Sequence, residues 1–404
     1  MKIYCLFVVF VLCFSKAGYA QTVPVFISGT EGHQSYRIPA IINLPSGDIL
    51  AFAEGRVNNA GDFGDVNIVM KRSTDNGKTW SGLQTVVDYN TLQAGNPAPV
   101  VDLSDPDYPK GRIFLFYNTG NNHESEVRKG NGLREVWYKT SVDAGKTWSD
   151  AVNITLQVHR PKQPAVNPSF NFTEDWRSYA NTPGHAMQFA GGVYNGRIYI
   201  AANHSAGDPK SNAEDYVAHG YYTDDHGKTF KLSEDIPVKG SNEATAAQLS
   251  GNRLMMNIRN QKGDIKSRIV AISADGGEKW DSVYFDKNLP DPVCEGSILN
   301  IGKRKGKNIL AFCNAAVTMR RDNLTLRISY DDGRTWPLSY TIARSKDGKP
   351  DYAAYSDLVK IGDGSVGVLF EKENYKQIVF QLVRWKKSRN PSLRNQRTKN
   401  NYHK

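Results

Sequence analysis

The sequence predicts an all-β fold, a six-bladed β-propeller in which small antiparallel sheets surround a central axis. Three observations predict it. An eight-residue pattern occurs five times along the 404 residues, short alternating runs of apolar and polar residues precede most copies, and helical periodicity is nearly absent. The chain is also long for one hydrophobic core, which favours either two domains or a core that is divided radially.

Each copy of the repeat has the composition of a tight turn. The copies occupy residues 73–80, 141–148, 223–230, 273–280 and 329–336. In each, an aspartate can accept hydrogen bonds from the backbone N–H groups that follow it, and a glycine can take a positive φ at little cost. The third copy, which ends in Phe230, and the fourth, which has Lys279, are looser. We therefore expect a hairpin turn inside a small sheet at each copy.

Strand-like segments before and after the repeats complete the predicted ring. Residues 23–28 and 41–52 precede the first copy, and three segments follow the last, at 355–360, 366–371 and 378–385. They can supply the rest of the first blade and a sixth blade that both termini close. Residues 155–185, rich in Pro, Asn and aromatic side chains, predict an insertion over one face of the ring.

The two ends of the chain differ from its body. Residues 1–20 are typical of a signal peptide, too short to span a membrane, which predicts a secreted or periplasmic protein. Two lysines there and eight Lys or Arg in residues 384–404 carry ten positive charges, which is the whole formal net charge of +10. We therefore expect one domain over 21–385, a basic tail over 386–404 that is either merely solvated or attracted to anionic surfaces, and no nucleic-acid partner.

Cysteine and histidine spacing indicates neither a disulfide framework nor a metal site. Beyond the signal peptide the sequence contains only Cys294 and Cys313, which can form one disulfide or remain two buried thiols. The eight histidines are scattered, without Cys-x-x-Cys or His-x-x-x-His. From this spacing we expect no metal-ligand cluster and no cofactor.

The repeat resembles the Asp box of the sialidase superfamily, and Tyr36-Arg37-Ile38-Pro39 is similar to the Arg-Ile-Pro motif of sialidases. The resemblance covers roughly residues 25–385. It implies an exo-α-sialidase that removes terminal sialic acid from glycoproteins, glycolipids or oligosaccharides, with retention of configuration through a tyrosyl-enzyme intermediate and without a cofactor.

The resemblance also implies a set of three arginines for the substrate's carboxylate. Arginine suits this task because its guanidinium group can bind a carboxylate with two parallel hydrogen bonds. The matching positions are Arg37, Arg259 and Arg321, and Arg320 is the alternative for the third. Arg321 is preferred because the family pattern there is Arg, one residue, Asn.

The family's catalytic residues match three further positions. Tyr355 in Tyr-Ser-Asp-Leu corresponds to the nucleophile, and Glu243 to the base beside it. Asp62 corresponds to the acid that protonates the leaving oxygen, with Asp65 as its competitor. Two supporting residues also match. Arg56 resembles the arginine near the sugar's 4-hydroxyl, and Glu371 the glutamate that orients the first arginine.

Two other functions are compatible with parts of the sequence. The same site could transfer the sialyl group to an acceptor sugar or to the substrate's own hydroxyl, with Phe172, Trp176 and Tyr179 of the insertion either forming an acceptor platform or only packing the loop. A non-catalytic glycan-binding propeller would also carry the repeats. That alternative predicts gaps in the catalytic set, and the sequence has none.

Overall fold

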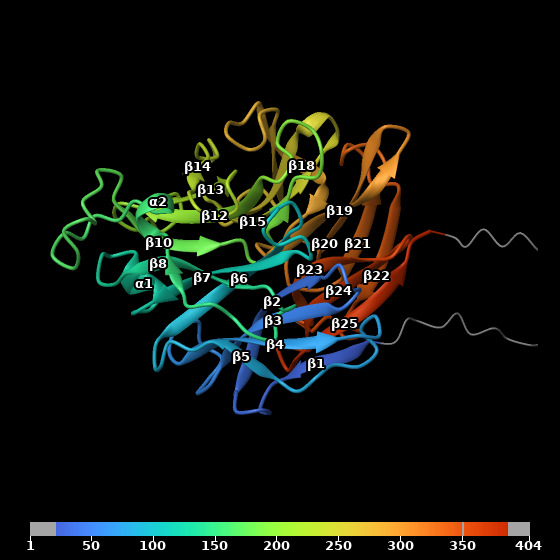
Figure 1. Ribbon diagram of the computed structural model, residues 1–404, viewed down its shortest axis with the longest axis horizontal. Coiled ribbons are helices and arrows are strands. Elements are labelled where there is room, and N and C mark those ends of the chain that lie inside the picture. Colours follow the sequence, from blue (N-terminus) through green and yellow to red (C-terminus); the bar gives the residue numbers. More distant parts are fainter. Residues whose placement is uncertain (1–21, 350, 387–404) are drawn as a thin grey trace, which may run out of the picture.

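The computed structural model describes residues 22–349 and 351–386, and it confirms an all-β propeller. In Figure 1 the sheets follow one another around the molecule from the blue to the red end of the chain, so that the first and last segments lie together. The expected signal peptide, residues 1–20, and all of the expected tail, residues 386–404, except Lys386, lie outside the described residues.

The chain begins and ends in the same four-stranded sheet. Its strands, in spatial order, are β1 (Val23–Ile27), β25 (Gln377–Arg384), β24 (Ser365–Lys372) and β23 (Ala353–Ile361). The pair of β1 and β25 is antiparallel and begins with Val23 opposite Phe380. The first strand of the described chain thus completes a sheet whose other three strands are the last.

Three other sheets contain consecutive strands. The first has β10 (Trp176–Asn181), β12 (Ile198–Ala206), β13 (Tyr216–Thr223) and β14 (Lys231–Leu232), with β11 (Met187–Gln188) paired to β12. The second has β15 (Ser241–Gln248), β16 (Leu254–Asn260), β17 (Ser267–Ser273) and β18 (Ser282–Pro290). The third has β19 (Gly296–Arg304), β20 (Lys307–Ala315), β21 (Leu324–Ser329) and β22 (Leu338–Ala343).

The eight-stranded sheet divides into two antiparallel groups of four. One group is β2 (Ser35–Asn43), β3 (Ile49–Arg56), β4 (Val66–Ser73) and β5 (Gln84–Val87). The other is β6 (Gln93–Asp102), β7 (Arg112–Gly120), β8 (Arg134–Ser141) and β9 (Val152–Asn153). A single parallel pair, Val66 with Gln93, joins them. The number of blades is therefore five or six, depending on whether this sheet counts once or twice.

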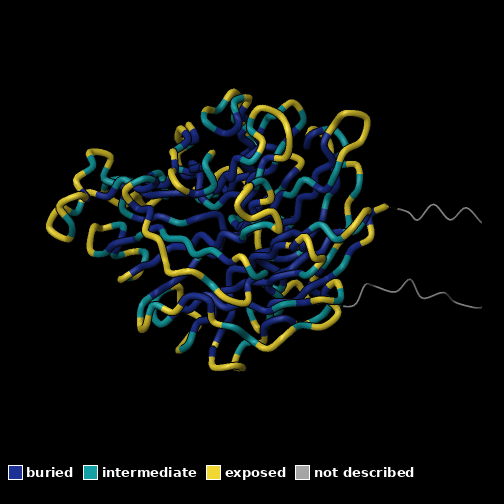
Figure 2. Tube along the Cα trace, viewed as in Figure 1, coloured by how far each residue is buried: buried dark blue, intermediate teal, exposed yellow. Residues whose placement is uncertain are grey.

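The hydrophobic core lies in wedges between neighbouring sheets. Phe116 of β7 and Tyr221 of β13 meet edge to face in one wedge, with ring centroids 5.9 Å apart. Ile328 of β21 and Val368 of β24 belong to another. In Figure 2 buried residues follow the strands, and exposed residues gather at the connecting loops. Alternating apolar residues bury both faces of each sheet, because each sheet has a neighbour on either side.

The five repeat copies fold into one kind of turn. In the first, Asp75 Oδ1 accepts from the backbone N–H groups of Lys78 and Thr79 at 3.0 and 2.9 Å, and Ser73 Oγ accepts from Gly77 N at 2.8 Å. Gly77 has a φ of +84°, and a Cβ there would clash with the ring of Phe380. Glycine is therefore required both by the backbone conformation and by the close approach of that ring.

Helices are minor elements. The described residues contain single turns at α1 (Glu124–Val127), α2 (Thr155–Val158) and η1 (Ser250–Asn252). No helix among them has the length and apolar character needed to cross a membrane. The segment after α2 extends outward in Figure 1, while Trp176 and Tyr179 at its end are buried in a core wedge. These two aromatics pack the fold, which favours packing over an acceptor platform, although Tyr179 also borders the cavity lined by Arg37 and Tyr355.

Cys294 and Cys313 are two buried free thiols, which decides between the alternatives that the sequence left open. Burial raises the pKa of each thiol to about 12, so both remain protonated and unreactive at neutral pH.

Candidate active site

The beginnings of the inner strands surround a cavity of about 290 Å³ at one end of the propeller axis. Strands β2, β6, β10, β15 and β23 each contribute side chains to it. Seven of the eight residues expected at the site line this cavity: Arg37, Arg56, Asp62, Glu243, Arg259, Arg321 and Tyr355. The eighth, Glu371, is buried directly behind it and bonded to Arg37.

Three arginines converge on one tyrosine. The guanidinium carbons of Arg37 and Arg321 lie 5.4 and 5.3 Å from the centre of the Tyr355 ring. Arg259 Nη1 donates a hydrogen bond to the Tyr355 hydroxyl at 2.8 Å. Arg320, the alternative to Arg321, instead bonds Asp322 at 3.2 Å with 42% of its side chain exposed. The structure therefore brings Arg321, and not Arg320, to the cavity.

The tyrosine hydroxyl also donates to a carboxylate. The distance from Tyr355 Oη to Glu243 Oε1 is 2.5 Å, and Glu243 Oε2 accepts from Arg259 Nη1 at 2.6 Å. Burial raises the pKa of Tyr355 well above its usual value, the Glu243 carboxylate raises it further, and Arg259 and Arg321 lower it. The site thus holds a neutral phenol whose proton points at a base.

Some of the positive charge at the site has no partner. Nε of Arg259 is buried and meets no acceptor among the described residues. Nε of Arg37 is taken by Glu371 at 2.6 Å, which leaves its terminal nitrogens for another anion. A buried guanidinium nitrogen without an acceptor, next to two further arginines at one cavity, indicates a site for an anionic ligand.

Glu371 fixes the first arginine and the tyrosine together. Its Oε1 accepts from Arg37 Nε and, at 3.0 Å, from the backbone of Ile38, while Oε2 accepts from the backbone of Tyr355 at 3.2 Å. Both strands are irregular here, with register shifts between Arg37 and Ala40 and between Ala353 and Ser356. The bulges release these N–H groups from the ladder, and the buried carboxylate satisfies them.

Ile38 has a φ of +58°, which is unfavourable for a β-branched residue. It sits between Arg37 and Pro39, where the chain turns one side chain toward the cavity. Strain of this kind persists only where the surroundings determine the conformation, and the bond from Ile38 N to Glu371 is part of that surrounding structure.

Asp62 lies at the mouth of the cavity with 81% of its side chain exposed, 2.8 Å from Arg56 Nη1. Desolvation opposes its ionisation, but the charges of Arg56, Arg37 and Arg321 outweigh that effect and hold the pKa of Asp62 below its usual value. Asp65, its competitor, does not line the cavity and bonds Asn67 Nδ2 at 3.5 Å. The geometry favours Asp62 for any contact with a ligand.

The cavity lining also contains two acidic residues that the sequence did not single out. Glu54 is buried, accepts two bonds from Arg56, and accepts from Asn96 N at 2.9 Å. Glu124 accepts from Tyr216 at 2.7 Å and from Ser178 at 2.5 Å. Neither residue lies in a motif of its own, and only the arrangement of the blades brings Glu54 and Glu124 to the same cavity.

The profile of the BNR repeat-like domain family matches residues 47–368. A sialidase of Micromonospora viridifaciens is 33% identical over 365 residues, covering 85% of this chain and 51% of the relative. An exo-alpha-sialidase of Arthroderma benhamiae is 29% identical over 379 residues, covering 87% of this chain and 82% of the relative. The chain therefore spans about half the length of the Micromonospora relative.

Solved structures share the fold. A Hadza microbial sialidase superposes with a TM-score of 0.73 at 24% identity, covering 88% of this chain and 67% of that one. The intramolecular trans-sialidase from Ruminococcus gnavus has a TM-score of 0.68 at 17% identity, covering 89% and 96% of the two chains.

Proposed function

This chain belongs to the sialidase family, and from that premise we propose that it is an exo-α-sialidase, a glycoside hydrolase that releases terminal sialic acid from glycoproteins, glycolipids or oligosaccharides. The observation that carries the proposal is the convergence of Arg37, Arg259 and Arg321 on the hydrogen-bonded pair of Tyr355 and Glu243. A cationic cluster beside a phenol and its base suits a substrate that carries a carboxylate on the carbon to be attacked.

The substrate's carboxylate is bound by the three arginines. Each can form charge-assisted hydrogen bonds, and Arg259 has a buried donor without a partner. This negative charge also explains a tyrosine nucleophile, because an anionic aspartate or glutamate would be repelled by it. Sialidases with a tyrosine nucleophile are a recognised exception to the two-carboxylate scheme of glycosidases.

In the first step Tyr355 Oη attacks the anomeric carbon while its proton passes to Glu243, which already accepts it at 2.5 Å. The bond from the anomeric carbon to the leaving oxygen breaks, and Asp62 gives that oxygen a proton. In the second step a water molecule gives a proton to Asp62 and attacks the anomeric carbon, and Tyr355 leaves and regains its proton from Glu243. Two inversions produce net retention of configuration.

Substrate binding would prepare Asp62 for its role as an acid. Without substrate, nearby arginines hold the pKa of Asp62 down, and Arg56 contributes the most of these. The substrate's carboxylate neutralises part of the charge on Arg37 and Arg321, and the sugar displaces water from the mouth of the cavity. Both changes raise the pKa of the carboxyl group toward the range of a useful general acid.

The proposal extends to the architecture. We count the eight-stranded sheet as two blades, since one parallel pair joins its halves and a core wedge lies between them. This gives six blades within a single domain over residues 21–385. A signal peptide over 1–20 would direct the protein to the periplasm or the outside of the cell.

The test is hydrolysis of a fluorogenic sialoside by the wild type and by Tyr355→Phe, with Tyr117→Phe as the matched control. Tyr117 is a buried core tyrosine outside the cavity. We expect Tyr355→Phe to lose at least about 10³-fold in kcat, since the nucleophile is removed, with its thermal transition preserved. Near-normal turnover by Tyr355→Phe would refute the nucleophile, and NMR of the first-formed product anomer tests retention and distinguishes hydrolysis from transfer.

A further inference from the structure

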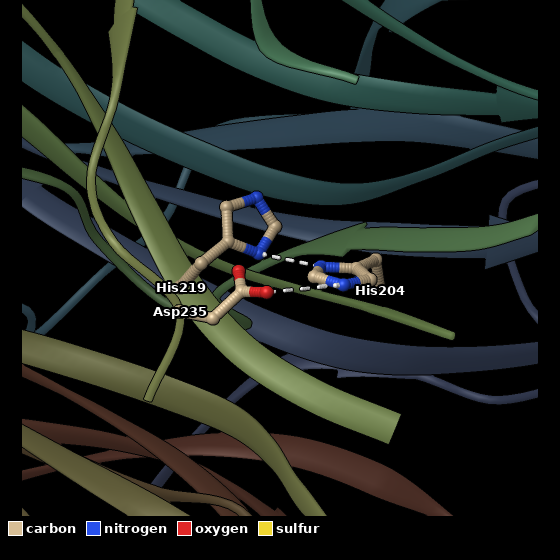
Figure 3. A group of neighbouring side chains, drawn as sticks. All are labelled: His204, His219 and Asp235. Carbon is tan, nitrogen blue, oxygen red and sulfur yellow. Dashed lines mark hydrogen bonds and ion pairs between the residues drawn. The ribbon is translucent and has the colours of Figure 1, made fainter. Parts of the chain in front are cut away.

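Two buried histidines face each other in the sheet formed by β10 to β14. His204 lies on β12 and His219 on β13, and the register places Ala202 opposite His219, so the histidines are diagonal neighbours. Their Nδ1 atoms are 3.1 Å apart, and each residue is at most 1% exposed. Figure 3 shows the two rings with their nitrogens directed at each other.

Neighbouring aromatic residues fix the orientation of both rings. His219 Nε2 lies 3.3 Å from the hydroxyl of Tyr179, and a proton on Nε2 that is donated there leaves a lone pair on Nδ1. Trp176 stacks on His204 with centroids 3.6 Å apart and planes 12° apart. A second partner that holds a histidine's other nitrogen, as Tyr179 does, is typical of histidines that ligate metals.

Asp235 completes the group from the loop after β14. Its Oδ2 lies 3.9 Å from His204 Nε2, as the second dashed line in Figure 3 shows. Desolvation raises the pKa of Asp235 to about 6. Among the described residues, its one ion-pair contact within 4 Å is His204. No arginine or lysine of the described residues lies within that distance of this carboxylate.

We propose that His204, His219 and Asp235 bind a divalent transition metal of the zinc class. One ligand atom from each residue lies within 4.8 Å of the others. A metal takes one nitrogen from each histidine, and the two Nδ1 atoms, 3.1 Å apart, lie close to the roughly 3.3–3.6 Å that separates two ligands on a tetrahedral ion with bonds of about 2.0–2.2 Å. Asp235 Oδ2 lies 3.9 Å from the other nitrogen of His204, so its side chain has to move toward this pair. The side chain of Asp235 is 47% exposed and can close the remaining gap, and solvent can supply the fourth ligand.

The donor set and its surroundings select the kind of metal. Two neutral imidazoles and one carboxylate suit zinc and its transition-metal neighbours, whereas Mg²⁺ and Ca²⁺ require mostly oxygen ligands. His219 is fully buried, and the positive charge of Arg160 acts on it. The same guanidinium repels a cation, so the negative charge of Asp235 is essential to the site.

The test is titration of the full chain, stripped with a chelator, with ZnCl₂ and separately with MgCl₂. Isothermal calorimetry and thermal melting are the readouts. We expect one Zn²⁺ per chain, an increase in Tm that Mg²⁺ does not produce, and at least about tenfold weaker Zn²⁺ binding in Asp235→Asn. Glu234→Gln is the matched control, since this exposed neighbour is 4.0 Å from Lys279 and outside the group.

Absence of Zn²⁺ binding in the wild type, or equal binding by Asp235→Asn and Glu234→Gln, would overturn the proposal. Because the first variant could alter the fold, circular dichroism of the metal-free forms is compared. His204→Asn, which removes a ligand on a different strand, must show the same selective loss. None of these measurements depends on sialidase turnover, so they test the metal site independently of the proposed activity.

Discussion

At one end of the propeller axis lies the charged cavity of about 290 Å³, and at the other a larger cavity of about 770 Å³. The same strands build both. The beginning of β2 contributes Arg37 to the first, and its end contributes Ile41 and Ile42 to the second. Strand β23 likewise contributes Tyr355 to one cavity and Leu358 and Val359 to the other.

The comparison shows that the volume of a cavity does not identify the end of the propeller at which the candidate active site lies. The larger cavity is lined mainly by aliphatic side chains and by polar residues without a charged cluster, whereas the smaller one gathers the three arginines and their carboxylate partners. Between them Asp357, two residues after Tyr355, accepts from Ile41 N at 2.8 Å and His185 N at 2.9 Å. The buried carboxylate of Asp357 on β23 thus connects this strand to β2 and to the segment before β11.

The largest effect expected at the charged end, after loss of Tyr355, is that of Asp62→Asn. Removal of the proton donor should lower kcat/KM by about 10²–10⁴-fold for a natural sialoside, whose leaving group needs protonation. A nitrophenyl sialoside leaves without that help and should lose much less. Steady-state kinetics on both substrates measures the difference, and equal losses on both would contradict the assignment.

A smaller effect is expected for Arg321→Lys, with Arg320→Lys as the adjacent control. Lysine keeps the charge but loses the planar pair of donors, so we expect KM to rise about 10–100-fold, corresponding to about 1.5–3 kcal/mol for bonds to a charged group. Arg320 bonds Asp322 away from the cavity, and its replacement should leave KM unchanged. A similar rise in KM for both variants would place the carboxylate elsewhere.

The smallest effect is expected at the other end, where His185 Nδ1 lies 2.6 Å from Asp357. Burial lowers the pKa of His185, but the Asp357 carboxylate outweighs it and leaves the pKa raised. The pair therefore contributes stability that is fully present below the unfolded-state value of about 6.5 and is lost as the pH rises through the folded-state value. Melting curves should show a fall in Tm above that pH in the wild type which His185→Gln lacks.

The sequence predicted those parts of the molecule that depend on local patterns. The repeat predicted the turns at residues such as Asp75 and Gly77, and short motifs located Arg37, Tyr355 and Glu371. It could not predict Glu54 or Glu124, because their place in the cavity depends on how the blades are arranged around the ring. The group of His204, His219 and Asp235 could not be predicted from histidine spacing either, because adjacent strands and a later loop bring these residues together.

Trp176 and Tyr179 show a second limit of the sequence. Their composition and position in a long insertion left an acceptor platform and loop packing as alternatives, and β10 pairs with β12 and carries both side chains into the wedge that holds Phe116 and Tyr221. Aromatic residues bury large apolar areas, and an inner strand with a neighbouring sheet offers them a core. Periodicity alone does not reveal which strand of an insertion becomes the innermost.

The pairing of β1 with β25 also has a consequence for how the protein is made. Residues Val23–Ile27 leave the ribosome before the other described strands, yet their partner strand, Gln377–Arg384, is the last of these strands to be synthesised. The ring cannot close until nearly the whole polypeptide is available, so the first strand must wait unpaired through most of translation, with its edge open to other chains. Any cleavage before Gln377 would remove this closure and leave an open, aggregation-prone array of sheets.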